Sequence, residues 1–89
     1  MNSHTSARFR KAYRELPVEV RDQAREAYKQ FRRDPYYPSL RFKQVHSSKP
    51  IYSVRVTRGY RALGVRNAEE IMWFWIGSHA EYDRLLSQL

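Results

Sequence analysis

Basic residues recur through the strand-forming half of this sequence, and their type and spacing are suited to binding phosphate groups. Tyrosines lie among them, and guanidinium groups beside aromatic rings can hold phosphates and stack nucleobases. Any single arginine of this kind can be a solvated surface residue, but that explanation is weaker for the whole set. Its members are Arg41, Lys43, Lys49, Arg55, Arg58, Arg61 and Arg66.

A second group with chemical potential follows the most apolar stretch of the chain, in the run GSHAEYD at residues 77–83. His79 could act there as a general acid or base near neutral pH. Tyr82 would be its neighbour one helical turn later if this segment is helical. The spacing alone slightly favours another interpretation, in which His79 is an exposed or capping residue and Tyr82 only packs. Glu81 and Asp83 are expected to be solvated rather than catalytic.

Several other chemistries have no basis in this sequence. The chain has no cysteine, which excludes disulfides, thiolate metal sites and a cysteine nucleophile. Its three histidines lack the spacing of metal ligands, so no metal site is expected. No glycine-rich phosphate loop and no serine hydrolase motif is present, and we expect no cofactor.

Length and charge limit the class of protein further. The 89 residues form one domain, 1–89, with 17 Lys and Arg against 9 Asp and Glu and a net charge of +8. Such an excess attracts nucleic acid, an anionic membrane or an acidic protein. No apolar run approaches the roughly 20 residues of a membrane helix, and no signal peptide is apparent. The absence of cysteine fits a cytoplasmic location, and no membrane partner is expected.

The elements that must position these residues begin with two helices. Apolar residues at positions 9, 12, 13 and 16 predict the first, and those at 20, 24, 27, 28 and 31 predict the second. Ser6 is a candidate N-cap of the first helix. The second should begin after Pro17 and end near Asp34, because Pro35 disfavours helical geometry in the residue before it. We expect the two helices to form a hairpin.

The remainder predicts four strands, within 40–45 and over 51–57, 60–66 and 70–77, and then a short helix over 80–89 with Ser78 as a candidate cap. Short turns make consecutive strands antiparallel, and the last strand is apolar on both faces, which places it centrally. If Val54 and Val56 pack on the helices, Arg55 points to the open face. The predicted fold class is α+β, with an N-terminal helical hairpin on a four-stranded, mainly antiparallel sheet and a short C-terminal helix.

Two runs in the strand half carry a family resemblance. They are YSVRVTRGYRALGVR at 52–66 and IMWFWIGSHAEYDRL at 71–85, preceded by the two helices and PSLRFK at 38–43 in the expected order. Together they resemble the RelE/ParE superfamily of type II toxin–antitoxin toxins over nearly the whole chain. Many members begin with a strand before the first helix, whereas residues 1–5 here form a poor strand by sequence.

The resemblance implies a toxin that is neutralised by a cognate antitoxin protein. RelE-like members cleave mRNA on the ribosome by promoting attack of a ribose 2′-hydroxyl on the adjacent phosphate, whereas ParE-like members poison DNA gyrase. Arg61 matches the phosphate-contacting strand arginine of the family, and Arg55 matches a basic position on the preceding strand. His79 matches a position that holds a basic residue or histidine in the ribonuclease branch. Tyr82 would replace a C-terminal tyrosine, at a different spacing.

Three functions therefore remain open: a ribosome-dependent mRNA endonuclease, a gyrase inhibitor that acts by binding alone, and a nucleic-acid-binding protein without toxicity. The run Gly-Ser-His-x-x-Tyr favours the first, because it adds a proton-transfer group to an arginine surface. The antitoxin is expected to carry an acidic or amphipathic segment that covers the positive face or displaces the C-terminal helix. In the endonuclease, the predicted catalytic residues are His79, Arg61 and Tyr82, and the predicted RNA-binding residues are Arg55, Lys43, Arg41, Lys49 and Arg58.

Overall fold

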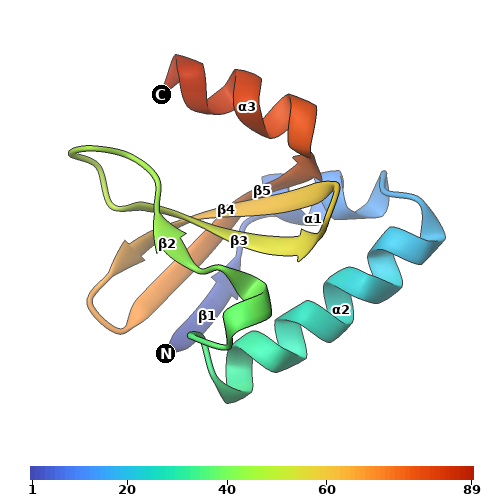
Figure 1. The fold of residues 1–89 in the computed structure, drawn as a ribbon, viewed down its shortest axis with the longest axis horizontal. Helices are drawn as coiled ribbons and strands as arrows, with labels where there is room; N and C mark the ends of the chain where they lie inside the picture. Colours follow the sequence, from blue (N-terminus) through green and yellow to red (C-terminus); the bar gives the residue numbers. More distant parts are fainter.

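The structure, a computed structural model that describes residues 1–89, is built on one five-stranded sheet with the spatial order β1-β5-β4-β3-β2 (Figure 1). Neighbouring strands are antiparallel except for β1, which runs parallel to β5. Helices cover both faces of this sheet. Because the sheet is mainly antiparallel and the helices precede and follow the main run of strands, the protein has the predicted α+β class. The strands are β1 (Asn2–Thr5), β2 (Lys43–Gln44), β3 (Ile51–Thr57), β4 (Tyr60–Asn67) and β5 (Glu70–Ser78).

The prediction of four strands was wrong, because residues 2–5 form a fifth. The strand β1 pairs with β5 in the register Asn2 to Glu70 through Thr5 to Trp73. The Trp73 indole Nε1 also donates to the Ser3 hydroxyl at 2.8 Å. The sequence of β1 shows no apolar alternation, which is why it was not predicted. Backbone pairing with β5, a strand far away in the chain, holds it in place. It also makes β5 an interior strand, as its apolar composition predicts.

Two helices, α1 (Ala7–Arg14) and α2 (Val18–Arg33), lie on one face of the sheet (Figure 1). Ser6 caps α1 as predicted, because its hydroxyl accepts a hydrogen bond from the Phe9 N–H at 3.0 Å. The helix α1 packs mainly on β5 and α2 mainly on β3, so each helix is held more by the sheet than by the other helix. None of the helices is long and apolar enough to cross a membrane.

The main core lies between this helical layer and the sheet. Phe31 of α2 is almost fully buried and meets Trp73 of β5 edge-on, with ring centroids 5.3 Å apart. A smaller apolar cluster of Ile51, Leu63 and Tyr82 lies on the opposite face, under α3 (His79–Gln88). The main core consists of Leu16, Val20, Phe31, Leu40, Val54, Ala62, Ile71, Trp73 and Ile76.

The third helix, α3, begins directly after β5 and is started by the predicted cap. The Ser78 hydroxyl accepts a hydrogen bond from the Glu81 N–H, and the Glu81 carboxylate accepts one from the Ser78 N–H. This reciprocal arrangement is a capping box, which satisfies backbone donors that a helix start otherwise leaves unpaired. It holds the first turn of α3 at the end of β5, where His79 begins the helix.

A glycine in β4 permits the close packing of β5 against its neighbour. The pairing of β4 with β5 is irregular between Leu63 and Gly64, and Gly64 is buried there. A Cβ atom on Gly64 would lie 2.8 Å from Trp73 and 2.9 Å from Ile71. Both neighbours are buried core side chains, which have little room to move.

We therefore expect Gly64→Ala to destabilise the protein by about 1–3 kcal/mol through overpacking. The matched control is Gly59→Ala, because nothing lies within 4 Å of a Cβ at Gly59 and its backbone does not need glycine. Thermal unfolding followed by circular dichroism compares the two. Equal melting temperatures would contradict this account of β4.

Candidate nucleic-acid interface

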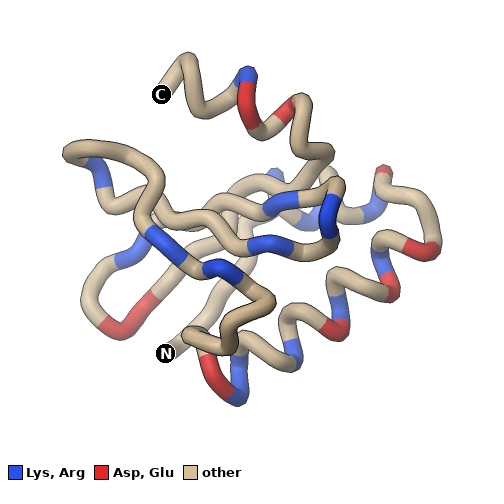
Figure 2. Tube along the Cα trace, viewed as in Figure 1, with Lys and Arg blue, Asp and Glu red and all other residues tan.

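The register of β3 on β4 brings two arginines together on the open face of the sheet. Arg55 pairs directly with Arg61, whereas the next pair, Val54 with Ala62, faces the main core. This confirms the prediction that Arg55 points to the open face of the sheet, opposite the core-facing Val54. Figure 2 shows that the basic segments before and within β2 also lie beside those of β3 and β4.

Burial and the neighbouring positive charges both affect the ionisation of the Arg61 guanidinium. Its pKa is lowered from the ordinary value, first by burial and then by the charge of Arg55. Arg41 lowers this pKa too, whereas Tyr82 and Asp83 raise it. Like charges directly opposite each other in a sheet are destabilising. A bound anion would remove that penalty, so the arrangement is suited to a phosphate group.

Arg61 is held in place by its own hairpin. Its Nη1 donates to the backbone carbonyl oxygens of Thr57, Arg58 and Tyr60, at 2.7, 3.3 and 3.0 Å. Its Nε and Nη2 atoms make no hydrogen bond within the protein and remain available to an anion. Because the guanidinium is already positioned by the turn, it can bind an anion with little loss of side-chain entropy.

His79 lies at the same end of the sheet. Its backbone N–H donates to the carbonyl oxygen of Gly59 at 2.8 Å, which ties the start of α3 to the turn between β3 and β4. Its imidazole Nδ1 lies 3.1 Å from a carboxylate oxygen of Asp83. A carboxylate at Nδ1 favours the tautomer that carries its proton there, which leaves Nε2 to exchange a proton with a substrate. The His79 side chain is 47% exposed, so a substrate can reach it.

Asp83 is the residue that sequence reasoning missed. It was expected to be only a solvated carboxylate, and at 62% side-chain exposure it is indeed in contact with solvent. The structure also makes it the partner of His79. The signal in the sequence was the i, i+4 spacing of the two residues, which places them on one face of a helix.

Tyr82, one of the predicted catalytic residues, is buried and packs in the small apolar cluster. It is 8% exposed and packs with Ile51 and Leu63 beneath α3. Its ring meets the His79 imidazole edge-on at 5.6 Å between centroids, and its hydroxyl is near enough to influence the pKa of Arg61. Tyr82 therefore supports the position of His79 and lies beside the arginine pair.

The remaining basic residues divide between two ends of the sheet. Lys43 pairs with Ser53 and therefore lies on the same face as Arg55, and the charge of Arg41 reaches Arg61. Arg58 is exposed in the turn after β3. Lys49, in contrast, lies in the loop before β3, at the opposite end of that strand from Arg55. The structure does not bring Lys49 to the group around His79.

Arg66 was among the basic residues suited to binding phosphate, but its guanidinium contacts other side chains of the protein instead. It lies over the rings of Tyr52 and Phe42, at 5.2 and 5.9 Å from their centroids. Hydrogen bonding to the Tyr36 hydroxyl raises the pKa of Arg66. These contacts show a packing role for Arg66. No three imidazole or carboxylate side chains converge where a metal ion could bind.

Comparison with known proteins gives the class to which this fold and site belong. Residues 18–84 match the family described as ParE-like toxin domain. This chain is therefore a member of the RelE/ParE superfamily of toxins from toxin–antitoxin systems. Comparison with curated protein sequences finds no match.

Solved structures confirm the fold. A chain of the RelB-RelE antitoxin-toxin complex from Methanococcus jannaschii is similar with a TM-score of 0.73 and 16% identity, over 91% of this chain and 96% of that one. YafQ from E. coli gives 0.72 and 12%, over 91% and 96%. The isolated E. coli RelE toxin gives 0.66 and 17%, over 99% and 98%.

We expect Arg55→Gln to relieve the repulsion with Arg61 and so to stabilise the protein by about 0.2–1 kcal/mol at low salt. If single-stranded RNA is the anion bound at this face, the same change should weaken its binding and flatten the salt dependence by about 0.7 in the log–log slope, as for one lost phosphate contact. Denaturant unfolding and fluorescence anisotropy measure the two effects. Arg8→Gln on α1 makes the same change of charge at an exposed position away from the site. If both variants behave alike, Arg55 has no special place in the surface.

Proposed function

We propose that this toxin is a ribosome-dependent endoribonuclease that cleaves mRNA. The observation that carries this proposal is that His79, oriented by Asp83, lies at the same end of the sheet as the Arg55–Arg61 pair. A binding surface needs only the arginines. An oriented imidazole beside them adds a group that can move a proton at neutral pH.

Cleavage of RNA at its own ribose needs two proton transfers. The 2′-hydroxyl loses its proton as its oxygen bonds to phosphorus, and the 5′-oxygen of the next nucleotide gains one as its bond to phosphorus breaks. The products are a 2′,3′-cyclic phosphate and a 5′-hydroxyl. Arg61 and Arg55 would stabilise the negative charge that builds on the phosphate oxygens between these events. His79 Nε2 would transfer the proton at one of the two oxygens.

The need for a ribosome is supported by the shape of this surface. Arg61 and His79 line neither of the two main grooves, which lie between α1 and α2 and beside β3, and Arg55 only borders the second. An open face positions a flexible RNA strand poorly by itself. A second surface that holds the strand in place would supply the orientation that such chemistry needs.

The test is primer extension on cellular transcripts after induction of the toxin. We expect new cleavage ends with the natural protein, and a loss of about 100-fold or more in cleavage with His79→Gln, the range for removal of a general acid or base. Glu19→Gln, an exposed position at the start of α2, is the control and should cleave normally. The proposal fails if growth stops while transcripts stay intact.

The second candidate is inhibition of DNA gyrase by binding alone, and the match to a ParE-like family favours it. In that case His79→Gln would remain as toxic as the natural protein. Loss of supercoiling or accumulation of DNA breaks would accompany the arrest. The same variant therefore distinguishes the two toxin functions.

A cognate antitoxin is the protein partner that this class implies, and a groove on the opposite face offers it a place. The groove, about 580 Å³ in volume, lies between α1 and α2 and has a floor of Val54, Ala62 and Trp73. Basic residues border it, so an amphipathic segment with acidic residues would match it in both polarity and charge. These border residues are Arg10, Arg14, Arg25, Lys29 and Arg32.

Ala24→Glu should therefore weaken neutralisation by the antitoxin while leaving toxicity unchanged, because Ala24 lines the groove and the new carboxylate would repel an acidic segment. Ala7→Glu places the same charge at an exposed position on α1. Growth on co-expression of toxin variant and antitoxin is the readout. Full neutralisation of Ala24→Glu would exclude this groove.

A further inference from the structure

A second hollow lies beside β3 and borders the arginine pair. It is a groove of about 750 Å³ between the polar face of α2, the 3-10 turn at Pro38–Leu40 and the last residues of β3. Arg55 lines it as well as facing Arg61, so the groove begins where the proposed phosphate site ends. A nucleotide next to the phosphate bound at Arg55 would reach it directly.

The two long walls of this groove carry opposite charge. Arg55 and Arg58 stand on the strand side, and Asp22 and Glu26 stand on the α2 side. Carboxylates repel phosphate, so an RNA backbone is confined to the strand side. A nucleobase has no such restriction, and its N–H groups can donate to carboxylate oxygens.

The acidic wall is available because its present ion pairs are weak. Asp22 pairs with Arg25 and Glu26 with Lys29, both within α2 and both largely exposed to solvent. Exposed pairs of this kind contribute little stability and exchange readily. A base with two adjacent donors can therefore replace such a pair at one carboxylate.

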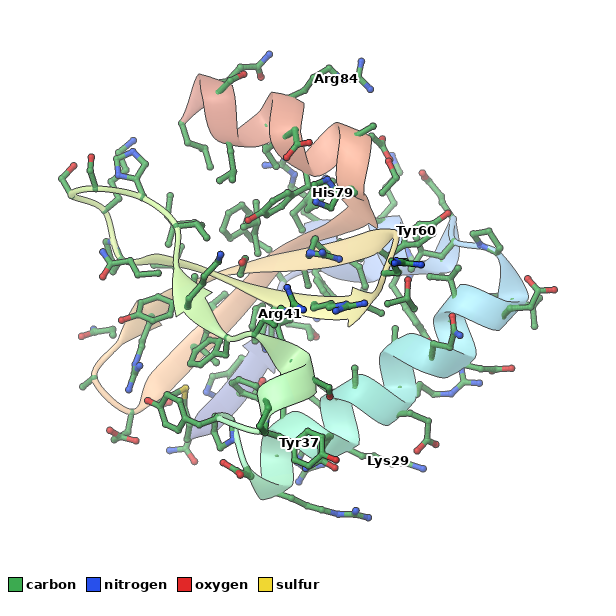
Figure 3. The ribbon with its side chains drawn as sticks, in the orientation of Figure 1. Lys29, Tyr37, Arg41, Tyr60, His79 and Arg84 are labelled. Atoms are coloured by element: carbon green, nitrogen blue, oxygen red, sulfur yellow. The ribbon has the colours of Figure 1, made fainter.

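The groove also has an aromatic platform and an unpaired strand edge. Tyr37, which is 44% exposed, lines it from the connector after α2, and Figure 3 shows this side chain beside α2, on the same side of the molecule as Arg41. The strand β2 pairs with β3 only at Tyr52 and Ser53, so residues 54–57 have no strand neighbour at this edge. Stacking and unused backbone groups are what single-stranded bases bind to.

We infer that this groove is a base-binding subsite for guanine in single-stranded RNA, next to the nucleotide whose phosphate lies at Arg55. The base stacks on Tyr37, and its N1–H and N2 amino group donate to Glu26, the carboxylate of the acidic wall that lies nearer to Tyr37 along α2. Uracil, which offers one N–H between two carbonyl oxygens, and adenine, which has no N1–H, fit the acidic wall less well. The inference rests on RNA being the ligand of the open face, as in the proposed function.

The test measures binding rather than cleavage, by fluorescence anisotropy with the full chain. The probes are adenine-rich RNA hexamers that differ at one position, which holds guanine, inosine, uracil or adenine. We expect guanine to bind most tightly, with inosine weaker because it lacks the N2 amino group. Equal binding of all four would overturn the inference.

Variants assign the preference to the groove. Tyr37→Ala should weaken binding of the guanine probe by about 5-fold or more, the effect of losing one stacked base, and Tyr37→Phe should restore it. Asp22→Asn combined with Glu26→Gln should abolish the difference between guanine and uracil. Tyr36→Ala is the matched control, because Tyr36 bonds to Arg66 outside this groove. If Tyr36→Ala and Tyr37→Ala act alike, the platform is wrongly assigned.

The outcomes separate this inference from the proposed function. If guanine is preferred through Tyr37 but transcripts stay intact in cells, the base-binding subsite is supported and the endoribonuclease function is contradicted. If cleavage depends on His79 but binding shows no base preference, the endoribonuclease function is supported and the base-binding subsite is contradicted.

Discussion

The pairing of β3 with β4 decides which side chains face the helices and which face the open side of the sheet. Val54 and Ala62 are opposite each other in the main core, and Arg55 and Arg61 are opposite each other one residue away. A slip of one residue would exchange the two faces and bury the arginines. Burial of the apolar pair on the core face therefore keeps two like charges side by side on the open face, although they repel each other.

This arrangement separates stability from function within one small sheet. The face under α1 and α2 holds the main core, including Phe31 and Trp73, and contributes most of the apolar burial. The other face holds only a small cluster under α3. Beside that cluster the sheet stays open, and His79 and the arginines lie there. Proteins commonly retain such unfavourable charge clusters where function needs them.

The protein presents three surfaces of different chemistry. The open face carries concentrated positive charge, the groove beside β3 has one basic and one acidic wall, and the groove between α1 and α2 is apolar with a basic border. A segment bound between α1 and α2 would leave the open face uncovered. An antitoxin that blocks RNA directly would therefore need a further segment on the arginine face or in place of α3.

Local patterns in the sequence determined the three α-helices, four of the five strands and the direction of Arg55. The alternation in β3 separates Val54 from Arg55, and Ser6 and Ser78 are helix caps, because these effects act between residues a few positions apart. The tertiary structure alone decided that residues 2–5 pair with β5 in parallel and that Lys49 lies away from His79. It also decided that Arg55 lines a groove together with α2 and Tyr37. Each of these facts joins segments far apart in the chain, where packing and backbone pairing set the positions and no short sequence pattern records them.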